Sequence, residues 1–332
     1  MNTETRRKLA NLRTDFESVT GSSFNHFYCP FLYRDEEVPV CKGHIVNYGF
    51  SNSSRRWTVQ RADVDHFFGA FFESDFLGIQ YREGVTPAQV LLNKELSKRY
   101  PPQILVNGKP VEHFMARGPV PPQFSEVVIQ GTGKEVRLGL KIHPAELIAS
   151  SVTTWEIEIA KDVRLAALVS LLKAAHLTLF DMLGYRYALS AGGYFLGFTA
   201  LGDFFLKNAA SDKANVLRIA DRHFRQFVHM VRPVGSEAPG LKGTVVDRLV
   251  YLCKTSHATP WAFVVFVRTS RSLHAVLCPV FEQADAIVRF LQFLENTNEH
   301  IEAFPCEFRG DKWAVSKKSL TLNWTKTGIL YP

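Results

Sequence analysis

The sequence predicts a mixed α+β protein, because it carries signals for strands and for helices in separate segments. Asn107-Gly108 stands between two apolar runs, a pattern typical of a two-residue turn in a β-hairpin. Between Asp162 and Leu183 apolar residues recur every three or four positions, which indicates a helix with a buried face, Asp162 as its N-cap and Gly184 just beyond its end. Residues 261–281 indicate two more strands joined by a polar turn. We therefore expect an α+β architecture.

The other elements can be placed in chain order around these three. They are a lead-in helix and linker over 1–28, a compact turn-rich segment over 29–100, strands over 101–160, and helices over 213–231 and 286–300. A loop with two prolines and three glycines at 231–243 marks a late boundary. We expect three consecutive segments: a compact N-terminal segment with its lead-in helix over 1–100, strands with buried helices over 101–235, and an α+β segment over 236–332.

The composition restricts the class of protein but does not indicate a function. A chain of 332 residues with 46% hydrophobic residues can bury a sizeable core, which excludes a disordered protein. No uncharged apolar run approaches the roughly 18–20 residues that a membrane span needs, so we expect no membrane partner. Five cysteines are an odd number for a disulfide framework and favour a reducing cytoplasm. A formal charge of +7 is compatible with a polyanionic partner but does not require one.

Two short motifs near the N-terminus carry the strongest functional signal. Gly43-His44-Ile45-Val46 is followed, after a polar bridge, by Val64-Asp65-His66-Phe67-Phe68-Gly69. Together they resemble the HNH nuclease family, in which a β-hairpin presents a histidine and a helix some twenty residues later completes a metal site. The resemblance covers residues 29–76 and implies an N-terminal ββα-type finger followed by a larger α+β body.

The resemblance implies a metal-dependent endonuclease that hydrolyses phosphodiester bonds in nucleic acid, with DNA favoured over RNA. Such hydrolysis needs a base that activates water and a cation that stabilises charge on the phosphate. His44 is the expected catalytic base. Asp65 is the leading metal ligand, because a carboxylate suits Mg²⁺ or Mn²⁺, with Zn²⁺ a further option. His66 and Glu73 lie seven residues apart, hence on one face of a helix capped by Asp63, and are secondary ligand candidates.

The chain departs from the family at positions that matter for a metal. Members often carry two Cys-x-x-Cys knuckles, but here only Cys29 remains, with Leu32, Arg61 and Val64 at the other three positions. A four-cysteine structural zinc site therefore cannot form. A stripe of phenylalanines over 67–76 can replace it by burying the helix, since each buried large apolar side chain contributes about 1.5–3 kcal/mol. Gly43 stands where many members have an acidic ligand.

A third group of residues suggests a contact with nucleic acid. Arg55 and Arg56 precede Trp57, so that the guanidinium groups could clamp a phosphate while the indole stacks on a base. A polar loop that ends at a strand explains the same residues almost as well. Two alternatives to an active nuclease therefore stay open: a finger that binds nucleic acid without cutting it, and a structural or interaction protein whose finger is a relic packed against the body.

Overall fold

The chain forms two compact units, one of them inserted into the other. The computed structural model describes residues 2–50, 56–77, 103–116, 118–131, 134–149, 155–158, 163–234, 249–254, 260–269, 273–280, 290, 298–309, 312–325 and 329–330. Unit 1 comprises Met1–Leu77 and Leu165–Pro332, and unit 2 comprises Gly78–Arg164. Helices and strands occur together, which confirms the predicted α+β class. The division differs from three consecutive segments, because unit 1 is closed by parts of the chain on both sides of unit 2.

Unit 1 begins with the predicted lead-in helix, α1 (Thr3–Thr20). Its first turn is capped by the Asn2 side chain, which accepts a hydrogen bond from the backbone N–H of Thr5 at 2.8 Å. It ends at Gly21, whose φ of 72° is a conformation that glycine adopts readily.

A hairpin and a helix follow directly on one another in the segment that carries the motifs. Strands β1 (Val40–His44) and β2 (Trp57–Arg61) pair antiparallel, with Cys41 opposite Gln60 and His44 opposite Trp57. Helix α2 (Ala62–Phe68) starts at the next residue and continues as the π-helical turn η1 (Gly69–Glu73). The segment thus has the order strand, strand, helix.

The long helix α7 (Val163–Ala188) is the centre of unit 1 and matches the predicted helix over 162–183. It runs past Gly184, whose φ of 59° interrupts the helical geometry. Asp15 of α1 accepts the backbone N–H of Tyr185 at 2.6 Å, which satisfies a donor at this kink. The stretch Leu165–Ala188 is long and apolar enough to cross a membrane by composition, but 72% of it is buried inside the structure, as in a core helix.

Five shorter helical segments follow α7 and cover its sides. They are α8 (Ala191–Tyr194), the π-helical η2 (Phe195–Gly202), α9 (Asp203–Asn208), α10 (Lys213–Phe224) and the 3₁₀ segment η3 (Arg225–Met230). The predicted helix over 213–231 is therefore an α-helix followed by a 3₁₀ turn.

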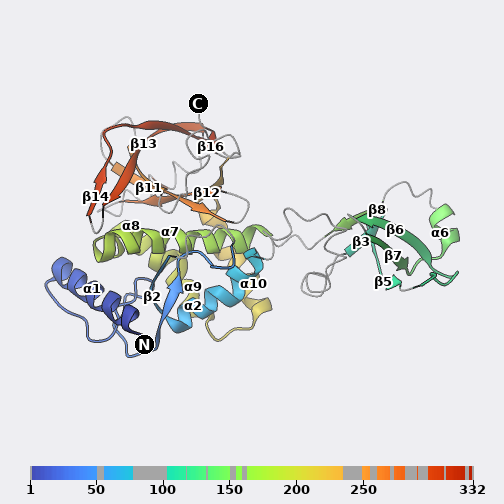
Figure 1. The fold of residues 1–332 in the computed structure, drawn as a ribbon, viewed down its shortest axis with the longest axis horizontal. Coiled ribbons are helices and arrows are strands. Elements are labelled where there is room, and N and C mark those ends of the chain that lie inside the picture. The colour runs from blue at the N-terminus through green and yellow to red at the C-terminus, as the bar shows by residue number, and fades with distance from the viewer. Residues whose placement is uncertain are drawn as a thin grey trace. The chain divides into compact units, whose positions relative to one another are not determined.

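The C-terminal part of unit 1 is an antiparallel sheet. Its strands are β9 (Val231–Pro233), β10 (Leu249–Lys254), β11 (Pro260–Arg268), β12 (Leu273–Pro279), β13 (Asn298–Arg309), β14 (Lys312–Val315), β15 (Leu320–Thr325) and β16 (Ile329–Leu330). They follow the order β16-β15-β13-β10-β11-β12-β9, with β14 paired to β13. The hairpin β11–β12 confirms the two strands predicted over 261–281. In Figure 1, α7 runs between this sheet and the layer that contains α1, β2 and α2.

One predicted helix, over 286–300, can be compared with the structure at a few residues. Most of the stretch lies outside the described residues, but Phe290 is helical, whereas Asn298, Glu299 and His300 belong to strand β13. The helix predicted there therefore does not include these three residues.

Unit 2 is built from two small antiparallel sheets. One has the order β4-β3-β8 and the other β5-β7-β6. The strands are β3 (Gln103–Val106), β4 (Lys109–Val111), β5 (His113–Ala116), β6 (Ser125–Gly131), β7 (Lys134–Leu140) and β8 (Trp155–Glu158), and α6 (Pro144–Ala149) lies between β7 and β8. Positive φ angles of 50° at Asn107 and 74° at Gly108 confirm the predicted hairpin turn.

Candidate functional site

Two of the predicted metal ligands meet at a buried lysine. Nζ of Lys173, in the middle of α7, donates to Oδ1 of Asp65 at 2.9 Å and to Oε1 of Glu73 at 2.6 Å. The Lys173 side chain is 0% exposed, and Glu73 is buried as well. The two carboxylates thus bind one cation, which the protein itself supplies.

The π-helical turn explains why Asp65 faces the same way as Glu73. In η1 the N–H of Ser74 bonds to the carbonyl of Gly69, five residues earlier, so this turn holds about one residue more than an α-helical turn. One α turn and one π turn together span about eight residues, which is the spacing of Asp65 and Glu73. The expected alignment of His66 with Glu73 assumed a regular α-helix, and His66 is exposed.

The start of α2 also differs from the expected one. Its N-cap is Arg61, and Asp63 lies inside the first turn. The Asp63 carboxylate is bound by the Arg61 guanidinium, at 3.1 Å from Nε and 2.8 Å from Nη2, and it accepts the N–H of Val64. Arg61 also pairs with Glu36. Arg61 therefore joins the helix start to the preceding loop through ion pairs.

These residues do not fit a divalent cation between Asp65 and Glu73. Burial acts to lower the pKa of Lys173, but the negative charges of Glu73 and Asp65 outweigh it and the pKa is raised, so the ammonium stays charged. A metal ion would have to share the site with this ammonium. Among the described residues, no three His, Cys, Asp or Glu side chains are grouped so that they could hold a metal.

In the structure, the side chain of Gln60 occupies the space beside Gly43. A Cβ placed on Gly43 would lie 2.1 Å from Nε2 of Gln60, so the Gln60 amide fills the space that a side chain at this position would take. Gln60 is almost fully buried, and neither amide atom has a hydrogen-bond partner in the described part of the protein. An amide donates and accepts hydrogen bonds but carries no charge, and therefore does not replace a carboxylate ligand.

His44 lies on the other face of the hairpin. Side chains alternate along a strand, and directly paired residues share a face, so Cys41, Gly43 and Gln60 face one way while Lys42, His44 and Trp57 face the other. The contacts agree with this: Sγ of Cys41 lies 3.7 Å from Oδ2 of Asp65, whereas Nζ of Lys42 lies over the Trp57 ring. The hairpin therefore separates the predicted base from the predicted metal ligand.

We call the face that carries His44 the outer face, and define it by Lys8 of α1 with Lys42, His44, Tyr48 and Trp57. The ammonium groups of Lys8 and Lys42 lie 4.8 Å and 4.5 Å from the centre of the Trp57 ring. The His44 ring lies 5.2 Å from the ring of Tyr48, in the turn after β1. The outer face thus combines aromatic rings with two lysines, each of which is paired with a carboxylate of the protein.

The predicted arginine clamp beside Trp57 is engaged within the protein. Arg56 pairs with Asp181 of α7, and the second oxygen of Asp181 accepts a bond from Lys8 at 2.5 Å. Asp181 is nearly buried, so this arrangement fixes α1 and β2 on α7. Arg55 lies outside the described residues.

Cys29 belongs to a cluster of buried apolar side chains. Cys29, Leu32 and Val64 are all buried, as are four of the five phenylalanines between 67 and 76. The turn closes with a bond from the N–H of Tyr33 to the carbonyl of Cys29 at 2.8 Å. His176 of α7 lies 3.2 Å from the carbonyl oxygen of Pro30, and burial lowers the pKa of this histidine to about 3, so it is neutral. These side chains are held together by buried apolar packing.

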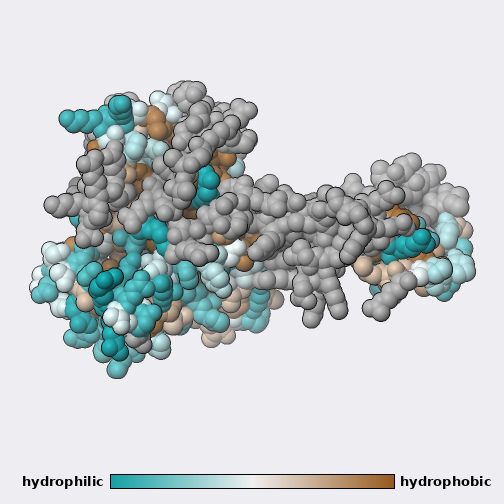
Figure 2. All heavy atoms as spheres, viewed as in Figure 1, coloured by the Kyte–Doolittle hydropathy of each residue, from teal (hydrophilic) through white to brown (hydrophobic). Residues whose placement is uncertain are grey.

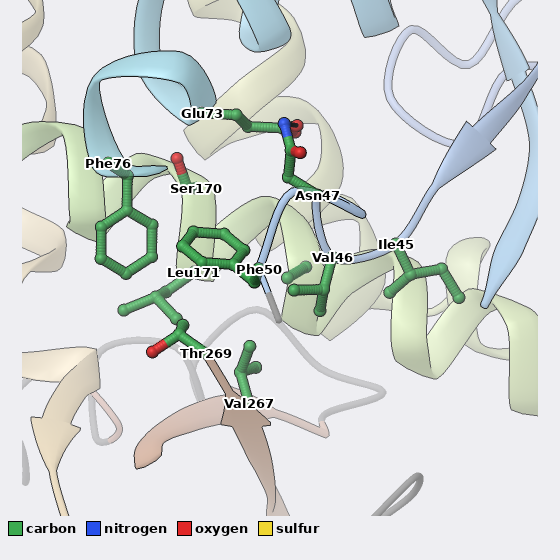
Figure 3. Close-up of a pocket in the computed structure, with 11 residues that line it drawn as sticks. Ile45, Val46, Asn47, Phe50, Glu73, Phe76, Ser170, Leu171, Val267 and Thr269 are labelled. Atoms are coloured by element: carbon green, nitrogen blue, oxygen red, sulfur yellow. Dashed lines mark hydrogen bonds between the residues drawn. The ribbon is translucent and has the colours of Figure 1, made fainter. Parts of the chain in front are cut away.

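A small pocket lies beside Glu73, between the turn after β1, α7 and β11. In Figure 3 the carboxylate of Glu73 lies against the side-chain amide of Asn47, which donates to Oε2 at 3.4 Å. Ile45, Phe50, Phe76 and Leu171 form much of the remaining wall. The wall is thus mainly apolar, with the one charged group already paired to Lys173.

The reactivity of Cys41 should report on Asp65. Burial, followed by the negative charge of Asp65 and a hydrogen bond to it, raises the pKa of Cys41 to about 12. We expect Asp65→Asn to lower that pKa and to speed alkylation of Cys41 at pH 8 by on the order of tenfold for each pKa unit, because only the thiolate reacts. Mass-spectrometric labelling with iodoacetamide measures the rate, and buried Cys253 is the internal control. An unchanged rate in a folded variant would contradict the contact between Cys41 and Asp65.

Lys173 is the functional residue that the sequence alone does not single out. Its one signal is a charge inside an otherwise apolar helical stripe, since a buried ammonium requires a partner. Which residues provide that partner depends on pairing across about a hundred residues of sequence.

Comparisons with known proteins add no second source of information. No family model matches the chain, and no curated protein or solved structure matches it.

Proposed function

We propose that this protein binds nucleic acid through the outer face of its hairpin and does not cleave it. The observation that carries the proposal is the position of Lys173, whose ammonium lies where the two carboxylates Asp65 and Glu73 converge. In this segment an internal ion pair stabilises the fold, and the Lys173 ammonium occupies the position between Asp65 and Glu73 that a metal ion would take. What the segment presents to a ligand is then the surface, not a catalytic centre.

The outer face has the chemistry that a polyanion requires. Lys42 is exposed on β1, and Lys8 on α1 is partly exposed. In the view of Figure 2, the part of unit 1 that α1 occupies in Figure 1 is covered largely by hydrophilic side chains. The pair between Lys42 and Glu4, at 3.1 Å, is half-exposed on both sides. Such surface pairs contribute only about 0–1 kcal/mol, so a phosphate can compete for the lysine.

Metal-dependent cleavage is the second candidate, favoured by the convergence of Asp65 and Glu73 within hydrogen-bond reach of one atom. It would require His44 to act at the same centre. The alternation of side chains on β1 directs His44 to the outer face, away from Asp65. For this reason we propose that the protein binds nucleic acid without cleaving it. Metal-dependent cleavage by the wild type would contradict the second part of this proposal.

The test measures binding and cleavage with the full chain. Fluorescence anisotropy with labelled DNA and RNA, at two salt concentrations, reports affinity, and the same samples incubated with Mg²⁺ or Mn²⁺ report cleavage. We expect affinity that falls steeply with salt, because bound lysines displace counterions from phosphates. Lys42→Gln should weaken binding and reduce the salt slope by about one.

The matched control is Lys141→Gln. Lys141 of unit 2 forms a similar exposed pair, at 2.7 Å from Glu112, so the variant removes the same charge outside the hairpin. We expect it to bind as tightly as the wild type. Absence of binding at low salt, or equal losses in both variants, would contradict the proposed interface. Metal-dependent cutting by the wild type, lost in His44→Ala, would show that the finger is an active nuclease.

A further inference from the structure

We propose that the ligand of the outer face is a single strand of nucleic acid, whose unpaired bases stack on Tyr48. This inference rests on the proposed function and adds the class of nucleic acid. It starts from the exposure of the Tyr48 ring. At 70% exposed, Tyr48 has the greatest exposure among the large apolar and aromatic side chains that the structure describes.

The neighbours of Tyr48 leave its ring accessible from solvent. Its described ring contact is with His44, at 5.2 Å between centroids and an interplanar angle of 43°. His44 is itself held by the ladder, paired with Trp57 and followed by a bond from the N–H of Ile45 to the carbonyl of Arg56. The two rings thus form a small aromatic surface on a fixed strand end, next to the positive charges.

Aromatic rings and lysines at this spacing serve different parts of a single strand. Bases stack on aromatic rings with little regard for sequence, while ammonium groups follow the phosphates. Lys42 is exposed, so its ammonium group can contact a phosphate. Its Nζ also lies 4.5 Å from the centre of the Trp57 ring. A single strand with one base stacked on Tyr48, in the turn after β1, would run back along β1 for a phosphate to reach Lys42.

A duplex cannot use the same surface equally well. In a duplex the faces of the bases are covered by their neighbours, and exposing one of them costs a few kcal/mol of stacking and pairing. A duplex would contact the lysines alone and gain nothing from Tyr48. The aromatic ring therefore distinguishes the two forms, and removing it should affect only one of them.

The experiment compares single-stranded with duplex oligonucleotides of the same sequence, as DNA and as RNA, by fluorescence anisotropy. We expect the single strand to bind more tightly. Tyr48→Ala should weaken single-strand binding by about tenfold or more and leave duplex binding unchanged, because stacking is lost while the charges remain. Tyr48→Phe keeps the ring and should bind like the wild type. Tyr194→Ala, which removes another half-exposed tyrosine, is the control and should have no effect.

Each outcome separates this inference from the proposed function. If the duplex binds as tightly as the single strand, or if Tyr48→Ala binds the single strand like the wild type, the single-strand inference is wrong while the proposed function stands. If neither form binds at low salt, both are wrong. If single-stranded DNA and RNA bind with different affinities, the tighter one is the preferred ligand, and the inference is supported whichever it is.

Discussion

Lys173→Met is expected to lower the free energy of unfolding by about 3–5 kcal/mol, because it leaves two carboxylates in a buried site without their cation. Methionine has nearly the length of the lysine side chain, so the loss comes from charge and not from a cavity. Glu73 carries most of the effect, since its side chain is only 11% exposed, against 29% for Asp65. Urea denaturation followed by circular dichroism measures the change.

A variant without any of the three charges is the control for the buried ion pairs. The triple variant Asp65→Asn, Glu73→Gln, Lys173→Met removes all three charges and should recover most of the loss. A single variant as stable as the wild type would show that the ion pairs are not buried in solution.

Local patterns in the sequence were sufficient to predict most of the elements. The helical spacing over 162–183 reappears as α7, and Asn107-Gly108 forms its hairpin turn, because both depend on residues close in sequence. The phenylalanine stripe was also predicted from local spacing, and the structure buries it. The insertion of unit 2 was not predicted, because hairpin signals show that strands exist but not against which elements they pack.

The candidate site depended on the pairing of distant residues, and here the sequence was less informative. The motif selected Asp65, and helical spacing from His66 selected Glu73; the structure brings these two together, but the cation between them comes from a helix far along the chain. Arg56 was selected as a phosphate clamp, and its partner Asp181 likewise lies 125 residues away. No known sequence pattern indicates the π turn in η1. The helix face of His66 was therefore predicted from the period of a regular α-helix, which does not hold across this turn.

Lys173→Ala should convert the buried ion pair into a site that binds Mn²⁺. Alanine removes the ammonium and leaves space where it stood, and two carboxylates with water are ligands that a hard divalent cation accepts. A cation that binds only the folded state stabilises it by about 2.7 kcal/mol at a hundred times its dissociation constant, so the midpoint of thermal unfolding should rise with Mn²⁺.

The comparison with other variants decides what the Mn²⁺ effect means. Lys173→Met fills the space, and Lys173→Ala with Glu73→Gln removes a ligand, so neither should be stabilised by the metal, and the wild type should not respond either. Even with Mn²⁺ bound, we expect Lys173→Ala to leave DNA uncut, because His44 remains on the outer face of β1. A wild-type protein stabilised by Mn²⁺ as strongly as Lys173→Ala would mean that the ammonium does not hold the position between Asp65 and Glu73. A folded Lys173→Ala protein without any response would mean that the two carboxylates do not converge once the lysine is gone.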